Sequence, residues 1–388
     1  MRRDALRLAT LTAALAAAAG ACSDGPVGLV HVDPRLAAEI PIAPNYGIHD
    51  TYVRDGIAFV AAWNTGVIIF DVGDGRAGGS PEHPVEISRL VPSANDVPGG
   101  PAVHNAWWFK DPSTGSARYL FLGQEGPGAV GQSSTGDIHV LDVSDLANPV
   151  EVAGLRIPGA GAHNFWMDES AAVLYAAYYN AGVIAVDVSG ELAGDLSDRV
   201  IATVAPGGAG ATFTWGVQLA AGALWASDMV SGFWKLDPAT LSPIGGGQNV
   251  ETRWGADLWV RPPMAYTGTW GGVARDGSFG NLVNVWSVSG SEPVLVDSIV
   301  VDQVRTVSDL QVSEDGALLA VTAEKGDGAG LHLYSLADPA HPVRVASIPV
   351  EAGLHTGTVA TIAGRIYVFA ARNPPSPALM IYDVTPEP

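Results

Sequence analysis

Residues 66–72 read GVIIFDV, an alternating apolar segment that starts at a glycine and ends in a small polar residue, and this pattern recurs along the whole chain. The seven copies are 66–72 GVIIFDV, 137–143 DIHVLDV, 182–188 GVIAVDV, 232–238 GFWKLDP, 282–288 LVNVWSV, 330–336 GLHLYSL and 378–384 ALMIYDV. Their polar terminal residues are 52 residues apart on average. A repeat of about 40–50 residues that carries several short strands is typical of a radial β array. The sequence therefore predicts a ring of seven similar units.

Each unit contains the pattern of four strands, which the second repeat shows most clearly. The segments 104–108, 118–124, 137–143 and 150–157 alternate apolar and polar residues, and Pro149 opens the last of them. Proline is tolerated on an edge strand, where its missing N–H breaks no ladder. Period-2 alternation without a helical period indicates an all-β protein. We predict a seven-bladed β-propeller with four-stranded antiparallel blades.

The last repeat stops after its third strand, and the beginning of the chain supplies a candidate for the fourth. Residues 36–42, LAAEIPI, resemble the outer-strand segment 344–350, RVASIPV. An N-terminal strand that completes the final blade leaves no open sheet edge at the seam. We therefore expect residues 35–388 to form one propeller domain whose ring is closed by an N-terminal strand.

The segments GVIIFDV, DIHVLDVSDLANPVEV and LHLYSLADPAHPVRV resemble the LVIVD repeat, which occurs in exported and surface proteins of bacteria that form β-propellers. The resemblance covers essentially all of residues 35–388. Blade four departs from it with GFWKLDP, and blade five has Ser287 in place of the aspartate. The resemblance implies a propeller and export, and it carries no catalytic motif.

The first 22 residues have the pattern of a lipoprotein signal peptide. Three arginines precede an apolar run over 8–19, small residues follow, and Cys22 is the only cysteine of the chain. The run is too short to span a bilayer, and the position of Cys22 resembles that of an acylated cysteine, although Ala19 stands where such signals usually have leucine. We predict cleavage and lipidation at Cys22, a linker over 23–34, and a periplasmic or cell-surface location; plain cleavage near Ala21 is the alternative.

The composition limits the partners. A formal net charge of −20 with only three lysines argues against nucleic acid and against electrostatic docking to anionic lipid. The membrane is therefore expected to be contacted only through the lipid anchor. A protein or glycan at the cell envelope is the expected partner, and we expect a monomer.

Aligned first strands bring histidines of four consecutive blades into one column. Neutral imidazoles at one level can bind a divalent transition metal, with neighbouring carboxylates orienting the rings or acting as bases. The alternative is structural: a repeated histidine can hydrogen-bond the next blade's backbone. The candidate metal ligands are His49, His104, His163 and His355, and the supporting carboxylates are Asp50, Asp257 and Asp309.

Aromatic residues gather near the same strand starts, where rings either stack on a sugar or apolar ligand or fill the wedge between blades. The candidate binding residues are Trp107, Trp166, Trp215 and Trp259. The Gly/Ser-rich insertion 125–137 is either a binding loop or without a role. No nucleophile elbow, phosphate loop, HExxH or paired CxxC motif is present. The sequence favours a non-enzymatic binding scaffold; the alternative is a metal-dependent oxidase, hydrolase or lactonase that uses the histidine column.

Overall fold

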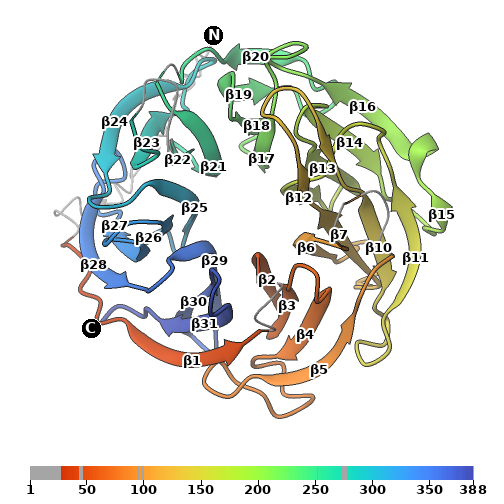
Figure 1. Cartoon of the computed structure of the whole chain (residues 1–388), viewed down its shortest axis with the longest axis horizontal. Helices are drawn as coiled ribbons and strands as arrows, with labels where there is room; N and C mark the ends of the chain where they lie inside the picture. The colour runs from red at the N-terminus through yellow and green to blue at the C-terminus, as the bar shows by residue number, and fades with distance from the viewer. Residues whose placement is uncertain are drawn as a thin grey trace, which may run out of the picture.

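Seven sheets, each built on four antiparallel strands, stand around a common axis, which confirms the predicted propeller (Figure 1). The computed structural model describes residues 28–42, 47–93, 97, 100–250, 252–271 and 278–387. The predicted signal segment and Cys22 lie outside these residues. Within them the one helix is the 3-10 turn η1 (Ser197–Arg199). The described residues therefore contain no helix that is long and apolar enough to cross a membrane.

Blades one to four run from the axis outward as β2 (Asp50–Arg54), β3 (Ile57–Ala61), β4 (Val67–Asp71), β5 (Val85–Leu90); β6 (Val103–Phe109), β7 (Tyr119–Gln124), β10 (Ile138–Asp142), β11 (Val150–Leu155); β12 (Phe165–Asp168), β13 (Val173–Ala177), β14 (Val183–Asp187), β16 (Val200–Val204); and β17 (Thr214–Ala220), β18 (Ala223–Asp228), β19 (Gly232–Leu236), β20 (Pro243–Gly246). Blades five to seven are β21 (Trp254–Arg261), β22 (Met264–Trp270), β23 (Leu282–Ser287), β24 (Val294–Val300); β25 (Thr306–Val312), β26 (Leu318–Glu324), β27 (Gly330–Ser335), β28 (Val343–Pro349); and β29 (Leu354–Ile362), β30 (Arg365–Arg372), β31 (Ala378–Asp383), β1 (Arg35–Pro41). Three short additions are β8 (Gly126–Pro127), which pairs with β9 (Ser134–Thr135), and β15 (Gly194–Asp195), which runs parallel to β11.

The core is divided into seven wedges between neighbouring blades. Each of seven clusters of buried apolar side chains joins two adjacent blades, for example Phe121 of blade two with Ile184 of blade three. Side chains of a strand point alternately to the two faces of its sheet, so a strand in the middle of a blade, such as the third strand, contributes to the wedges on both sides of that blade. This explains why the third strands read as nearly continuous apolar runs.

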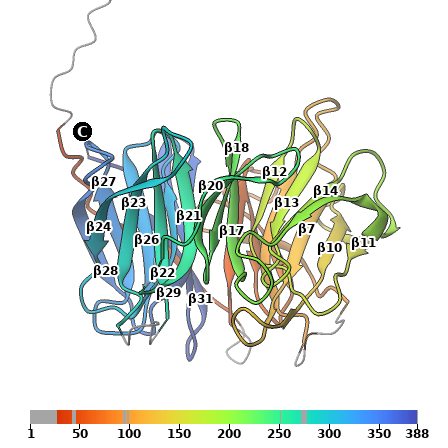
Figure 2. The same cartoon turned by 90° about the horizontal axis from the view of Figure 1, so that it is seen from above.

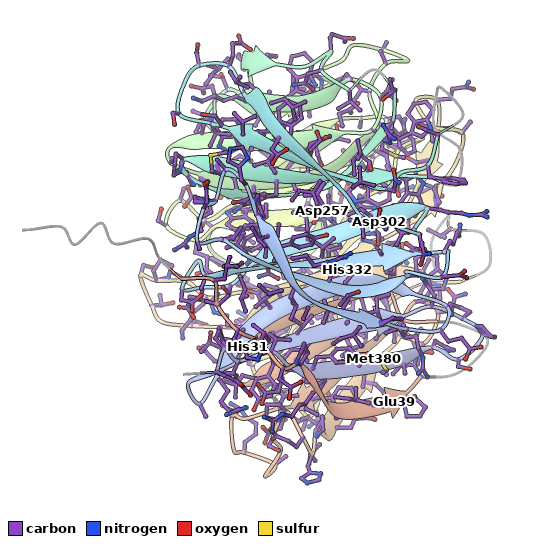
Figure 3. All side chains as sticks on the ribbon, turned by 90° about the vertical axis from the view of Figure 1, so that its left-hand side faces the viewer. His31, Glu39, Asp257, Asp302, His332 and Met380 are labelled. Carbon is purple, nitrogen blue, oxygen red and sulfur yellow. The ribbon has the colours of Figure 1, made fainter. Side chains whose placement is uncertain are left out.

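The N-terminal strand closes the ring, as predicted. β1 pairs antiparallel with β31, from Arg35 opposite Asp383 to Pro41 opposite Ala378. Figure 1 shows β1 on the outside of the last blade, and Figure 3 shows Glu39 near its partner Met380. Ile42 follows β1, is only 6% exposed, and packs in the wedge between blades seven and one.

Register shifts occur at two recurring places. Every blade has a shift between its third and outer strands, and five blades have one between the first and second strands. The strands run between the two faces of the ring (Figure 2). First strands begin, and second strands end, at the same face, which we call the mouth face.

Candidate functional site

Six aromatic side chains surround the axis at the mouth face and form what we call the channel ring. In order around the axis they are His355, His49, His104, His163, Trp215 and Trp270. Successive ring centroids from His355 to His163 are 4.0 Å apart, and the following separations are 4.2, 4.8 and, back to His355, 6.0 Å. The structure thus brings together all four histidines of the predicted column. Trp270 comes instead from the end of a second strand, because blade five has only Ala256 in the column.

β-bulges direct several of these side chains toward the axis. The register shifts between first and second strands fall at His104, Trp215 and His355, and also at Ala256–Asp257 and Ser308. A bulged residue is unpaired on its strand, and its side chain is redirected from the regular alternation. His49 and His163 reach the same level by preceding their strands, anchored by N–H bonds to the carbonyls of Ala61 and Ala177.

The four histidines differ in the partners of their ring nitrogens. His163 donates from Nδ1 to the carbonyl O of Trp215 at 2.6 Å, and Nδ1 of His355 contacts the Glu324 carboxylate. His104 is 1% exposed, and neither of its ring nitrogens has a hydrogen-bond partner among the described residues. A buried polar atom without a partner is uncommon and destabilising. His104 is therefore the histidine that the structural alternative does not explain.

Glu125, the first residue after β7, joins this group and was not identified from the sequence. Its Oε2 lies 3.4 Å from Nε2 of His49 and 3.9 Å from Nε2 of His104. Its Oε1 accepts a hydrogen bond from the hydroxyl of Tyr179, which itself packs on His163. His49, His104 and Glu125 are the only described His, Cys, Asp or Glu residues whose donor atoms form a group of at least three within 4.8 Å of one another.

Burial controls the protonation of the group. It lowers the pKa of His49 and His104 far below the usual imidazole value, and the other imidazoles lower both further. Burial also raises the pKa of Glu125. His355 differs: burial lowers the pKa of its ring, but the charge and hydrogen bond of Glu324, together with the charges of Glu125 and Asp309, raise it above the usual value. Within the channel ring, the pKa of His355 is therefore shifted in the opposite direction from those of His49 and His104.

The three predicted aspartates lie one residue further along the first strands. Burial and the charge of Asp309 raise the pKa of Asp50 to about 7 and that of Asp257 well above its usual value. Asn164 donates to Asp257 at 3.0 Å, and Asp309 accepts from the N–H of Gly357 at 2.7 Å. The partnered imidazoles bond Trp215 and Glu324 rather than these aspartates, which instead form a carboxyl tier of their own.

The candidate aromatic residues belong to two different groups in the structure. Tyr52, Trp107, Trp166 and Trp259 form an arc with centroid separations of 5.1, 5.2 and 6.0 Å, whereas Trp215 belongs to the channel ring. All four arc side chains are partly exposed, and the indole Nε1 of Trp107 has no hydrogen-bond partner among the described residues. The arc, the carboxyl tier and all members of the channel ring except Trp270 line one cavity of about 210 Å³.

A second cavity, of about 380 Å³, is lined in part by Glu125. Its wall includes Trp63, Asn64, Ala102 and part of the insertion, at Gly126–Gly128 and Ser133–Thr135. Trp63 stacks on His49 with centroids 5.2 Å apart. The insertion 125–137, which was predicted to be either a binding loop or without a role, therefore supplies both Glu125 and part of the wall of this cavity.

These features define the chain as a seven-bladed β-propeller with a histidine-lined channel mouth. Among solved structures it is similar to the WD40 β-propeller domain of Doa1, with a TM-score of 0.60 and 8% identity over 90% of this chain and 97% of that one. It is also similar to the computationally designed Ika8 protein, with a TM-score of 0.54 and 10% identity over 87% and 84% of the two chains. No family model and no curated protein sequence matches the chain. At such low identity the similarities show the fold alone.

Proposed function

We propose that the chain is an exported, lipid-anchored β-propeller of the LVIVD-repeat type that binds a glycan at the cell envelope. The repeat segments and the signal-like N-terminus with Cys22 support the export and the anchor. The observation that carries the binding role is the partly exposed aromatic arc, which shares its cavity with the carboxyl tier.

This combination suits a sugar better than a purely apolar ligand. Indole and phenol faces stack on the C–H faces of a sugar ring, while carboxyl and amide groups bond its hydroxyls. Asp50, Asp257 and Asn164 line the same cavity as the aromatic arc. No arginine or lysine lines the cavity within the described residues, so an anionic ligand is disfavoured.

A glycan array followed by calorimetry tests this role on the body comprising residues 28–388. We expect a neutral glycan to bind, and Trp107→Ala and Trp166→Ala each to weaken it at least tenfold. Trp234→Ala is the matched control, because Trp234 is also partly exposed but packs outside the channel, between blades three and four. If all three variants bind as tightly as the unmodified chain, the ligand does not lie on the aromatic arc. If no glycan on the array binds, the proposed glycan-binding role is refuted.

The anchor is tested separately in cells that carry the full chain. Cys22→Ser removes the thiol that acylation requires, so we expect the variant to leave the membrane fraction. A variant that stays in the membrane fraction would refute the lipid anchor without affecting the binding proposal.

A further inference from the structure

We propose that His49, His104 and Glu125 form a binding site for one divalent first-row transition metal ion at the mouth of the channel. The three residues come from blades one and two, and their donor atoms all lie within 4.8 Å of one another. This site goes beyond the glycan-binding role and does not depend on it. A bound metal is also the first requirement of the metal-dependent enzyme that the sequence left as the alternative.

The first argument is the buried imidazole of His104. Its neighbour His163 shows how the fold satisfies a purely structural ring, through a bond to the backbone of the next blade. No such bond is made by His104, although a bulge in β6 redirects this residue and it is almost fully buried. A metal at Nε2 uses the lone pair that the fold leaves unpartnered.

The second argument is the spacing of the donors. Ligand atoms about 2.0–2.1 Å from a tetrahedral zinc ion are roughly 3.3–3.4 Å apart. The distance from Nε2 of His49 to Oε2 of Glu125 is 3.4 Å, and that from His104 to the same oxygen is 3.9 Å. A small movement of Glu125, which stands at the beginning of the insertion, brings the second distance into the same range.

The third argument is the chemistry of the donor set. Two imidazoles and one carboxylate favour zinc or ferrous iron, whereas calcium and magnesium prefer sites made of oxygen atoms alone. The hydroxyl of Tyr179 donates to the other oxygen of Glu125 and so orients the carboxylate. Glu125 also lines the 380 Å³ cavity, which gives a small donor ligand a route to the remaining coordination position.

Zinc titration of metal-stripped protein without a histidine tag tests the site, together with metal analysis of the protein as purified. We expect one zinc ion per chain, and at least a 100-fold loss of affinity in both His104→Ala and Glu125→Gln. Glu125→Gln is nearly isosteric and keeps a partner for Tyr179, so it separates loss of metal from loss of fold. His139→Ala is the matched control, because His139 is also buried beside a glutamate, Glu151, but lies away from the channel.

Two results would overturn the proposal. One is the absence of stoichiometric zinc, or zinc that Glu125→Gln and His104→Ala bind as tightly as the unmodified chain. The other is a loss in His163→Ala and His355→Ala as large as in His104→Ala while Glu125→Gln binds normally, which would indicate a site of four imidazoles. A variant that loses zinc but keeps glycan affinity leaves the proposed binding role intact and supports a separate metal site.

Discussion

Ile42 is the residue through which the closing strand contributes most directly to the core, and Ile42→Ala tests the closure. The side chain is 6% exposed in the wedge between blades seven and one, and the Ile42 N–H bonds the carbonyl of Pro377 at 2.9 Å. Truncating a buried isoleucine to alanine costs about 2–5 kcal/mol, depending on how far the surroundings relax. Because Ile42 lies near the end of the wedge, we expect about 2–3 kcal/mol.

This loss translates into a small but measurable change in melting temperature. Unfolding entropy of about 2.1 cal/mol/K per residue gives roughly 0.75 kcal/mol per degree for a body of about 350 residues, so Ile42→Ala should lower Tm by about 3–4 °C. Leu36→Ala, at a position 51% exposed within β1, is the control and should change Tm by less than one degree. Calorimetry should show a single transition that moves as a whole. An unchanged main transition in Ile42→Ala would mean that β1 is an accessory strand rather than part of the ring.

Three further predictions concern the interior. His332 donates from Nε2 to Gly328 O at 3.0 Å, and burial lowers its pKa to about 4, so its contribution of about 3 kcal/mol is complete above pH 6.5 and is lost as pH falls toward 4. Because burial also lowers the pKa of His49, His104 and His163, every variant that keeps them loses stability in acid. Urea unfolding at both pH values should therefore show a loss about 3 kcal/mol smaller in His332→Gln than in the unmodified chain, whereas exposed His83→Gln should lose as much as the unmodified chain. Burial raises the pKa of Asp257, so the folded chain keeps a proton that the unfolded chain releases, and stability falls as pH rises above about 4. The Tm of Asp257→Asn should therefore rise relative to that of the unmodified chain between pH 5 and 8. A difference in Tm that stays constant over this range would contradict the raised pKa. Gly216→Ala places a Cβ 2.5 Å from Oδ1 of Asp257 and should destabilise by about 1–3 kcal/mol in urea unfolding, whereas Gly290→Ala, with no atom nearer than 3.7 Å, should be neutral.

The fold was predictable because one local pattern is repeated in every blade. The run GVIIFDV and its six copies mark the third strands, and the observed β7, β10 and β11 begin and end within two residues of the predicted segments. The similarity of residues 36–42 to an outer strand was enough to predict the closure, because a propeller leaves one edge to be filled.

The candidate site was predictable only in part. The histidine column follows from alignment of the first strands, and the structure places all four rings together. Glu125, Tyr179, Glu324 and Trp270 were missed because they stand at or just after the ends of second strands, where the repeat has no common residue. The signal was nonetheless present: second strands end at the face where first strands begin, so the residues that close them belong beside the column. The bulges at His104 and His355 could not be predicted from the sequence, because the alternation of apolar and polar residues does not locate an inserted residue.

The closing strand also determines when the molecule can finish folding. The carboxylate of Glu39 in β1 accepts a hydrogen bond from Arg372, 333 residues away, and β31 is the last strand among the described residues. Contacts of such sequence separation form late, because the intervening chain must be ordered before they compensate for loop closure. Among the described strands, the most N-terminal one therefore pairs only after the most C-terminal one has been synthesised. Until β31 is present, β1 has no partner and blade seven has no complete sheet, so quality control that recognises unpaired strand edges would retain chains whose synthesis has stopped early.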